Sequence, residues 1–149
     1  MSESIEAVDV LETPGLYRAL SSSSTAYYLN TRMTEHPWPA LLRARGTGVT
    51  GAGRHDNRWV RLDTLISGPR LEDGPLTVPP DQIDTKDLRE WVLRVGSRHR
   101  YEFYVPGGLL EMTDFWWTQR TCTAIERLES MPPESEWNVP ETDDPRYRR

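Results

Sequence analysis

Hydrophobic and polar residues alternate along several short stretches of this chain, with the period of two that a half-buried β-strand produces. In residues 40–45, Leu42 and Ala44 fall on one side and Arg43 and Arg45 on the other. Aromatic and β-branched residues, which favour strands, are frequent in three further stretches. We therefore predict strands at 25–30, 40–45, 58–66 and 100–105, the first three paired as an antiparallel meander.

Residues 114–130 show instead the spacing of an amphipathic helix, in which apolar residues recur every three or four positions. Asp114 is a suitable N-cap, and the Pro132-Pro133 pair would end the helix. On this helix Trp117 lies on the apolar face, and its neighbour Trp116 points toward the polar side. Trp117 is therefore predicted to anchor the helix in the core.

Three shorter segments complete the expected order of elements. Residues 13–20 begin with a Thr-Pro pair, which is typical of a helix start, and predict a short helix. The next segment fits a helical turn at 84–89 that leads into a strand at 90–95, although a helix up to Gly96 fits the same apolar positions. Residues 109–112 are predicted to return as a strand after a Gly-rich hairpin turn.

These elements predict an α+β fold, in which a mostly antiparallel sheet of five or six strands carries the short N-terminal helix and the C-terminal helix packed on one face. A single domain is expected at residues 13–131, because a chain of this length buries enough surface for one core. Residues 1–12 are predicted to form a mobile acidic N-terminal segment. Residues 132–149 are predicted to form an extended or disordered Pro-rich charged tail.

The formal net charge of −5 belongs to the two ends of the chain rather than to the domain. Residues 1–12 hold four acids and no base, and residues 132–149 hold five acids and three bases, so the middle is close to neutral. This balance disfavours both a nucleic-acid mimic and a strongly basic DNA-binding face. Every basic residue except Lys86 is arginine, which indicates a GC-rich genome, such as that of an actinobacterium or one of its phages.

Cysteine content and hydropathy indicate a location for the protein. Cys122 is the single cysteine and cannot form an intrachain disulfide, which suits a reducing compartment. The sequence has neither an apolar run of about 18 residues nor a hydrophobic N-terminal segment. We therefore expect a cytoplasmic protein without membrane contact, located in the host cytoplasm or in the virion if a phage encodes it.

Candidate catalytic chemistry is sparse. Cys122 lies at the edge of the apolar face of the predicted helix, as a buried structural thiol would. His36, His55 and His99 lie in three separate predicted turns, without the paired spacing of a zinc site. His55 is followed by Asp56 in a segment that is typical of a polar turn. We therefore rank an enzyme as a third possibility, below the two binding functions that follow, and expect neither a cofactor nor a metal.

Exposed aromatic residues suggest a small accessory protein that binds a protein partner or a second copy of itself. Trp116 lies outside the apolar face of its helix, with Arg120 close by, and Trp137 stands alone in a polar tail. Tryptophan and arginine are enriched among residues that dominate binding energy at protein interfaces. We predict Trp116, Trp137 and Arg120 as protein-binding residues, although each tryptophan has an alternative in packing against the domain.

The alternative function is binding of single-stranded nucleic acid or phosphate. Arg94, Arg98 and Arg100 gather around one predicted turn, with Tyr104 nearby, and arginine with aromatic residues on a sheet is a known arrangement for gripping such ligands. Glu102 interleaves with these bases, so cross-strand ion pairing explains the same pattern. We rank this function below protein binding.

Overall fold

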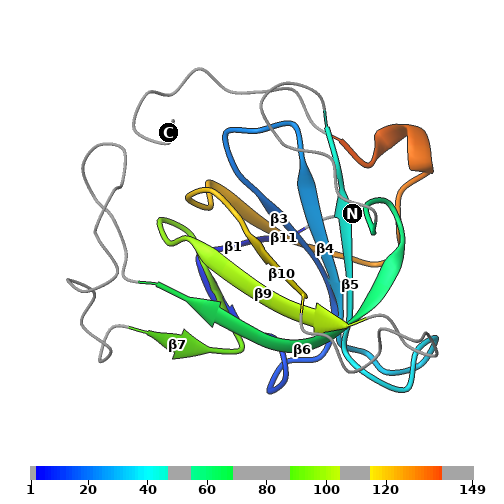
Figure 1. The fold of residues 1–149 in the computed structure, drawn as a ribbon, viewed down its shortest axis with the longest axis horizontal. Helices are drawn as coiled ribbons and strands as arrows, with labels where there is room; N and C mark the ends of the chain where they lie inside the picture. Colours follow the sequence, from blue (N-terminus) through cyan, green and yellow to red (C-terminus); the bar gives the residue numbers. More distant parts are fainter. Residues whose placement is uncertain (1–2, 47–54, 69–87, 105–114, 139–149) are drawn as a thin grey trace.

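A computed structural model describes residues 3–46, 55–68, 88–104 and 115–138. The described chain is built almost entirely of antiparallel strands (Figure 1). The strands are β1 (Glu3–Ile5), β2 (Ala7–Asp9), β3 (Leu16–Leu20), β4 (Ala26–Asn30), β5 (Ala40–Ala44), β6 (Trp59–Ser67), β7 (Arg89–Glu90), β8 (Val92–Arg94), β9 (His99–Tyr104), β10 (Phe115–Thr118) and β11 (Ala124–Leu128). A three-residue 3-10 turn, η3 (Glu134–Glu136), follows them.

One large sheet has the strand order β1-β11-β3-β4-β5-β6-β9-β10, and β7 pairs with β6 beside this path. Strands β2 and β8 form a separate two-stranded sheet. The predicted antiparallel meander is confirmed, because β4 pairs with β5 and β5 with β6 in antiparallel register. The predicted strand at 100–105 is confirmed as β9, and the strand at 90–95 is interrupted at Trp91, whose φ of 61° separates β7 from β8.

The predicted α+β class is wrong, since both expected helices are strands. Residues 13–20 contain β3, and residues 114–130 contain β10 and β11, joined by a link at 119–123. The backbone groups of these strands are paired across the sheet, β10 with β9 and β11 with β3. The link shifts the alternation between the two strands, so that buried residues such as Trp117, Cys122 and Ile125 acquire an irregular spacing that resembles a helical one.

The large sheet curls around its main core. The rings of Tyr27 on β4 and Tyr101 on β9 stack with their centroids 4.7 Å apart, although two strands lie between β4 and β9 in the sheet. Trp117 on β10 meets the same Tyr27 ring edge-on at 6.2 Å. Side chains from distant strands can meet in this way only because the sheet folds back on itself, as Figure 1 shows.

The link at 119–123 connects the two ends of the curled sheet. The backbone amide of Gln119, its first residue, donates to the His99 carbonyl at 2.8 Å. The Cys122 amide, further along the link, donates to the Ser97 carbonyl at 2.8 Å. At its end, the Thr123 amide donates to the Leu20 carbonyl at 2.8 Å. One continuous stretch of chain therefore passes from pairing with β9 to pairing with β3.

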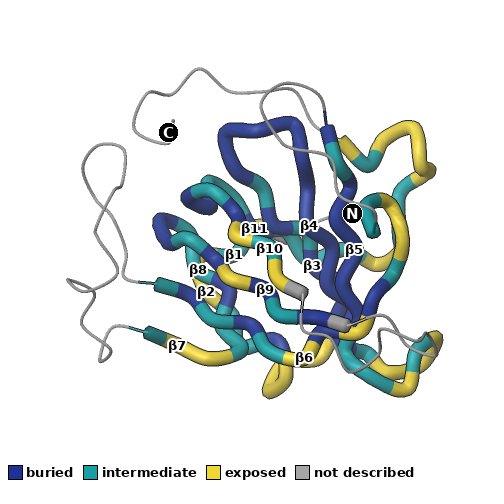
Figure 2. The backbone as a smooth tube through the Cα atoms, viewed as in Figure 1, coloured by how far each residue is buried: buried dark blue, intermediate teal, exposed yellow. Residues whose placement is uncertain are grey.

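The segment that follows β11 covers the part of the outer face formed by β4 and β5. We call residues 129–138 the C-terminal strap. Its Met131 and Trp137 pack with the outer cluster, which contains Tyr28 and Leu42, and the Tyr28 hydroxyl donates to the Trp137 carbonyl at 2.7 Å. The Asn138 amide nitrogen donates to the Ala44 carbonyl at 2.7 Å and the Ser24 carbonyl at 3.3 Å. Figure 2 accordingly shows β4 and β5 buried along their length.

This cover changes the expected orientation of β5. Leu42 and Ala44 lie on the outer face beneath the strap, whereas Arg43 lies on the inner face and is 8% exposed. The Arg43 guanidinium forms an ion pair with Asp56 at 3.3 Å and lies 5.3 Å from the centre of the Trp117 ring. Both faces of β5 are therefore buried, and the charge on its inner face is paired.

Residues predicted to be terminal segments also take part in the fold as far as they are described. Strands β1 and β2 lie within residues 1–12 and pair with β11 and β8. Residues 132–138 of the predicted tail belong to the strap. The predicted strand at 109–112 and residues 84–87 of the helical turn predicted at 84–89 lie outside the described residues, and Arg89 at the end of that turn belongs to β7.

Candidate functional site

The side chain of Trp116 stands out on the surface of the sheet. Adjacent residues of a strand point to opposite faces, so β10 directs Trp117 inward and Trp116 outward. Trp116 is 58% exposed, whereas Trp117 packs against the main core. The strand, rather than a helix, is the reason for the different environments of the two neighbours.

Charged residues of β9 surround the exposed indole. Trp116 lies opposite Glu102 in the antiparallel register, and Thr118 lies opposite Arg100. The Arg100 guanidinium carbon lies 5.2 Å from the centre of the Trp116 ring, and its Nε lies 4.0 Å from the Glu102 carboxylate. We call Trp116, Thr118, Arg100 and Glu102 the Trp116 surface.

The same surface includes an edge of the large sheet. Among the described strands, β10 pairs with β9 alone and ends the strand order. The Gln119 amide bonds to the His99 carbonyl, and hydrogen-bonded and non-hydrogen-bonded pairs alternate along an antiparallel ladder. The backbone groups of Trp116 and Thr118 therefore point away from β9, toward the edge.

Of the other two predicted protein-binding residues, Trp137 lies in the strap and Arg120 lies just after β10. Trp137 is half-buried in the strap, where its indole N–H donates to the Pro132 carbonyl at 3.0 Å and its ring centre lies 6.4 Å from that of Tyr28. Arg120 follows β10 and is half-buried. None of the contacts of the described residues joins Trp137 to Trp116.

The predicted arginine cluster does not converge on one ligand position. The Arg94 guanidinium donates to the Gly68 carbonyl, and the Arg98 Nε donates to the Gln119 carbonyl at 3.4 Å. Arg100 turns instead to the Trp116 ring. The side chain of Tyr104 lies outside the described part of the structure. Two of the three arginines thus contact backbone carbonyls of the protein itself.

A buried polar network lies beneath this region. The Gln119 side-chain oxygen lies 2.7 Å from the Tyr101 hydroxyl, which donates to it, and 3.0 Å from His99 Nδ1. The side-chain nitrogen of Gln119 donates to the Ala19 carbonyl at 3.1 Å. His99 Nε2 accepts from the backbone amide of Arg94 at 2.9 Å. The network joins β3, β8, β9 and the 119–123 link, so it holds the closure of the sheet in place.

Burial dominates the ionisation of the groups around this network. It lowers the pKa of His99 to about 4, against a small opposing contribution from the Gln119 hydrogen bond, and it raises the pKa of Tyr101. Burial also raises the pKa of the nearby Cys122 thiol to about 12. All three groups are therefore neutral at pH 7, which fits a structural role. Sequence reasoning placed His99 in a turn, and that position did not suggest this network.

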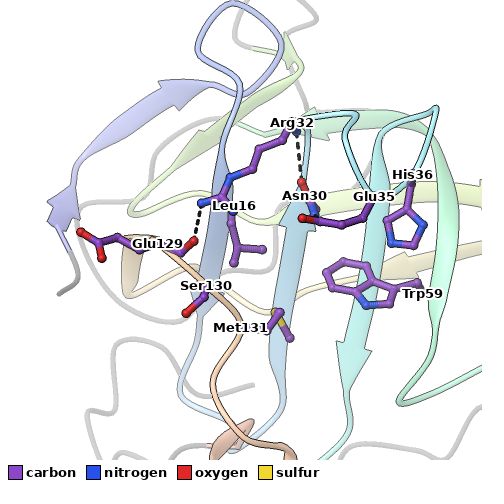
Figure 3. A pocket seen from close by; sticks show the side chains of 9 residues that line it. All are labelled: Leu16, Asn30, Arg32, Glu35, His36, Trp59, Glu129, Ser130 and Met131. Carbon is purple, nitrogen blue, oxygen red and sulfur yellow. Dashed lines mark hydrogen bonds between the residues drawn. The ribbon is translucent and has the colours of Figure 1, made fainter.

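A pocket of about 550 Å³ opens on the outer face, beside the start of the strap. It lies where β3 begins and β4 ends, and Trp59 of β6 forms part of its wall. Figure 3 shows the residues that line it, which are Leu16, Asn30, Arg32, Glu35, His36, Trp59, Glu129, Ser130 and Met131. None of them was predicted as a site residue, because they come from four separate stretches of sequence.

Within the described ranges, no three His, Cys, Asp or Glu side chains lie close enough together to hold a metal ion. The same residues include no helix that could cross a lipid bilayer. No protein-family model, curated protein or solved structure matches the chain.

Proposed function

We propose that this chain is a small non-enzymatic protein that binds a protein partner through the Trp116 surface. The observation that carries the proposal is the 58% exposure of a tryptophan on an ordered strand. Large aromatic side chains are mostly buried in folded proteins, and an exposed one costs free energy that a partner would recover. Tryptophan beside arginine is also the composition of an interface hot spot.

The edge position of β10 supports an extended partner segment. The backbone groups of Trp116 and Thr118 point outward, so a partner strand aligned along β10 could pair with them. Trp116, Arg100 and Glu102 would then supply specificity beside that strand. Their mix of one apolar ring, one base and one acid suits a protein surface better than a uniformly anionic ligand.

Binding of nucleic acid has weaker support. A phosphate-binding surface needs several cations directed at one path. Arg94 and Arg98 are directed at the Gly68 and Gln119 carbonyls, and Arg100 has the Glu102 carboxylate 4.0 Å away. We retain the proposal that Arg120, half-buried just after β10, adds a contact at the rim of the protein interface.

We also propose a cytoplasmic location and a phage origin in a GC-rich host. The single buried thiol suits a reducing compartment, and the arginine bias suits such a genome.

Substitution of Trp116 tests the function. The purified protein and its Trp116→Ala variant are used to capture partners from the native cell, and the captured protein is then titrated against each variant by calorimetry. Loss of a hot-spot tryptophan should weaken binding by about 30-fold or more. Leu11→Ala is the matched control, because it truncates an exposed apolar side chain outside the Trp116 surface, and it should change the affinity less than about threefold.

The fold and the oligomeric state are measured in parallel, by circular dichroism and analytical ultracentrifugation. A Trp116→Ala variant that keeps its fold and binds the partner as tightly as the parent would refute the proposal. If the parent forms a dimer that Trp116→Ala dissociates, the partner is a second copy of this chain.

A further inference from the structure

The pocket on the outer face has an aromatic wall that does not depend on the Trp116 surface. The His36 ring stacks on Trp38 with centroids 5.0 Å apart, and it also lies 5.5 Å from the centre of the Trp59 ring. His36 and Trp59 line the pocket and are half-buried. Stacked rings that hold one another in place form a rigid apolar surface, on which a planar ligand group can lie.

A guanidinium group is held on the opposite side. Arg32 Nη2 donates to the Leu128 and Glu129 carbonyls at 2.8 Å each. Among the described residues, its remaining N–H groups have no hydrogen-bond partner and the side chain forms no salt bridge. A positively charged group with fixed orientation and free donors is suited to a carboxylate.

A carboxylate is held between the guanidinium and the rings. The side-chain amide nitrogen of Asn30 donates to Glu35, and the Asn30 oxygen accepts from the Arg32 backbone amide at 3.1 Å (Figure 3). Glu35 forms no salt bridge with any described side chain. The carboxylate of Glu129, in contrast, is directed away from Glu35 and Trp59 in Figure 3.

We propose that this pocket binds a small zwitterion that carries an aromatic ring, with an aromatic α-amino acid as the chemical class. The ligand ammonium would pair with Glu35, its carboxylate with the free donors of Arg32, and its ring with the wall of His36 and Trp59. The two opposite charges decide the ligand class. The Glu35 carboxylate would repel a simple anion, and the Arg32 guanidinium would repel a simple cation. The volume of about 550 Å³ accommodates such a molecule.

A series of four ligands tests the proposal on the unmodified full-length protein by isothermal titration calorimetry. The series is L-phenylalanine, phenethylamine without the carboxylate, hydrocinnamate without the amine, and L-alanine without the ring. Each of the last three should bind about 10-fold more weakly than L-phenylalanine or worse, because each loses one charged or stacking contact. Equal binding of all four, or no binding of L-phenylalanine at millimolar concentration, would overturn the proposal.

Two variants assign the charges. In Glu35→Gln, the ratio of the affinities for L-phenylalanine and hydrocinnamate should fall to less than about threefold. In Arg32→Gln, the ratio of the affinities for L-phenylalanine and phenethylamine should fall to the same level. Glu12→Gln and Arg58→Gln, two exposed charged residues outside the pocket lining, are the matched controls and should leave both ratios unchanged. Ratios measured within one variant are insensitive to a uniform loss of pocket structure. Ratios that stay at the parent values in Glu35→Gln would overturn the assignment, and the ligand series decides by itself if Arg32→Gln does not fold.

Discussion

Nδ1 of His99 lies 3.0 Å from the side-chain oxygen of Gln119, and this contact fixes the proton on the ring. Nε2 accepts a hydrogen bond from the Arg94 amide, so it carries no proton in the neutral imidazole. Nδ1 therefore carries the proton and donates it to the glutamine oxygen. A second proton on the ring would face the Arg94 amide, and its charge would be buried without a compensating acid.

The stability of the protein should consequently fall as the pH is lowered through the range in which His99 would titrate. Burial holds the folded-state pKa at about 4, below the ordinary value of 6.5. Between these values the unfolded chain binds a proton that the folded chain does not, so the contribution of His99 is fully present above pH 6.5 and is lost toward pH 4. The loss is on the order of 3 kcal/mol.

Urea unfolding of the parent and of His99→Gln measures this effect across that pH range. The difference between their unfolding free energies should decrease as the pH falls. The variant lacks the His99 imidazole and keeps every other titratable group, so those groups cancel in the difference. A difference that is constant with pH would show that His99 does not titrate as the structure requires.

Gln119 should be among the most sensitive residues to substitution. Gln119→Leu would leave the His99 N–H, the Tyr101 hydroxyl and the Ala19 carbonyl without their partner in a buried place. Each unsatisfied buried group costs about 1–3 kcal/mol, so we expect a loss of several kcal/mol in unfolding free energy. Thr118→Val, one residue earlier and exposed, should change it by less than about 0.5 kcal/mol. Similar effects of the two substitutions would contradict the role of the network.

The region of this network could not be predicted from the sequence, whereas several strands could. Strands β5, β6 and β9 could be predicted because each carries a local alternation of apolar and polar residues, and β4 could be predicted because it is rich in aromatic and β-favouring residues. Residues 114–130 could not, because the segment changes its pairing partner at 119–123 and its buried residues lose the period of two. Nothing local distinguishes a buried Gln119 from a solvated one, since its three partners come from β3 and β9.

The faces of β5 and the pocket were unpredictable for a related reason. Leu42 was expected on the buried face of β5 and Arg43 on the open one, but Leu42 lies on the outer face under the C-terminal strap, and Arg43 lies on the inner face, paired with Asp56. The pocket gathers Arg32, Glu35 and Trp59 with the start of the same strap. Contacts between segments about a hundred residues apart in the chain leave no periodic trace in either segment.

Gly46 should tolerate no side chain. A Cβ atom at this position would lie 1.9 Å from the Ser24 hydroxyl oxygen and 2.7 Å from the Ser24 carbonyl carbon, so the backbone would have to move. We expect Gly46→Ala to lower the unfolding free energy by about 1–3 kcal/mol in a urea titration. Gly68→Ala is the control, because its nearest contact is 3.8 Å, and it should be close to neutral. Equal stability of the two variants would refute the close approach.

Cys122 should be unreactive while the protein is folded. The thiol is fully buried, donates to the Ala124 carbonyl at 3.4 Å, and has its pKa raised to about 12 by burial. The reactive thiolate is therefore almost absent at pH 8. A thiol reagent such as Ellman's should label no cysteine in the native protein and one per chain in guanidinium chloride. Rapid labelling of the native protein would place Cys122 at the surface.

The two exposed-aromatic candidates should separate experimentally into a binding residue and a packing residue. Trp137 of the strap packs on Tyr28 of β4. Trp137→Ala should therefore lower the unfolding free energy by about 2–4 kcal/mol and leave the affinity for the partner unchanged. Trp116→Ala removes an indole that is 58% exposed, so it should change the unfolding free energy by less than about 1 kcal/mol while weakening partner binding about 30-fold or more. Chemical unfolding and calorimetric titration of both variants measure the two quantities. The opposite pattern, with partner binding lost in Trp137→Ala alone, would mean that the strap opens to bind and that its packing on β4 is one of two states.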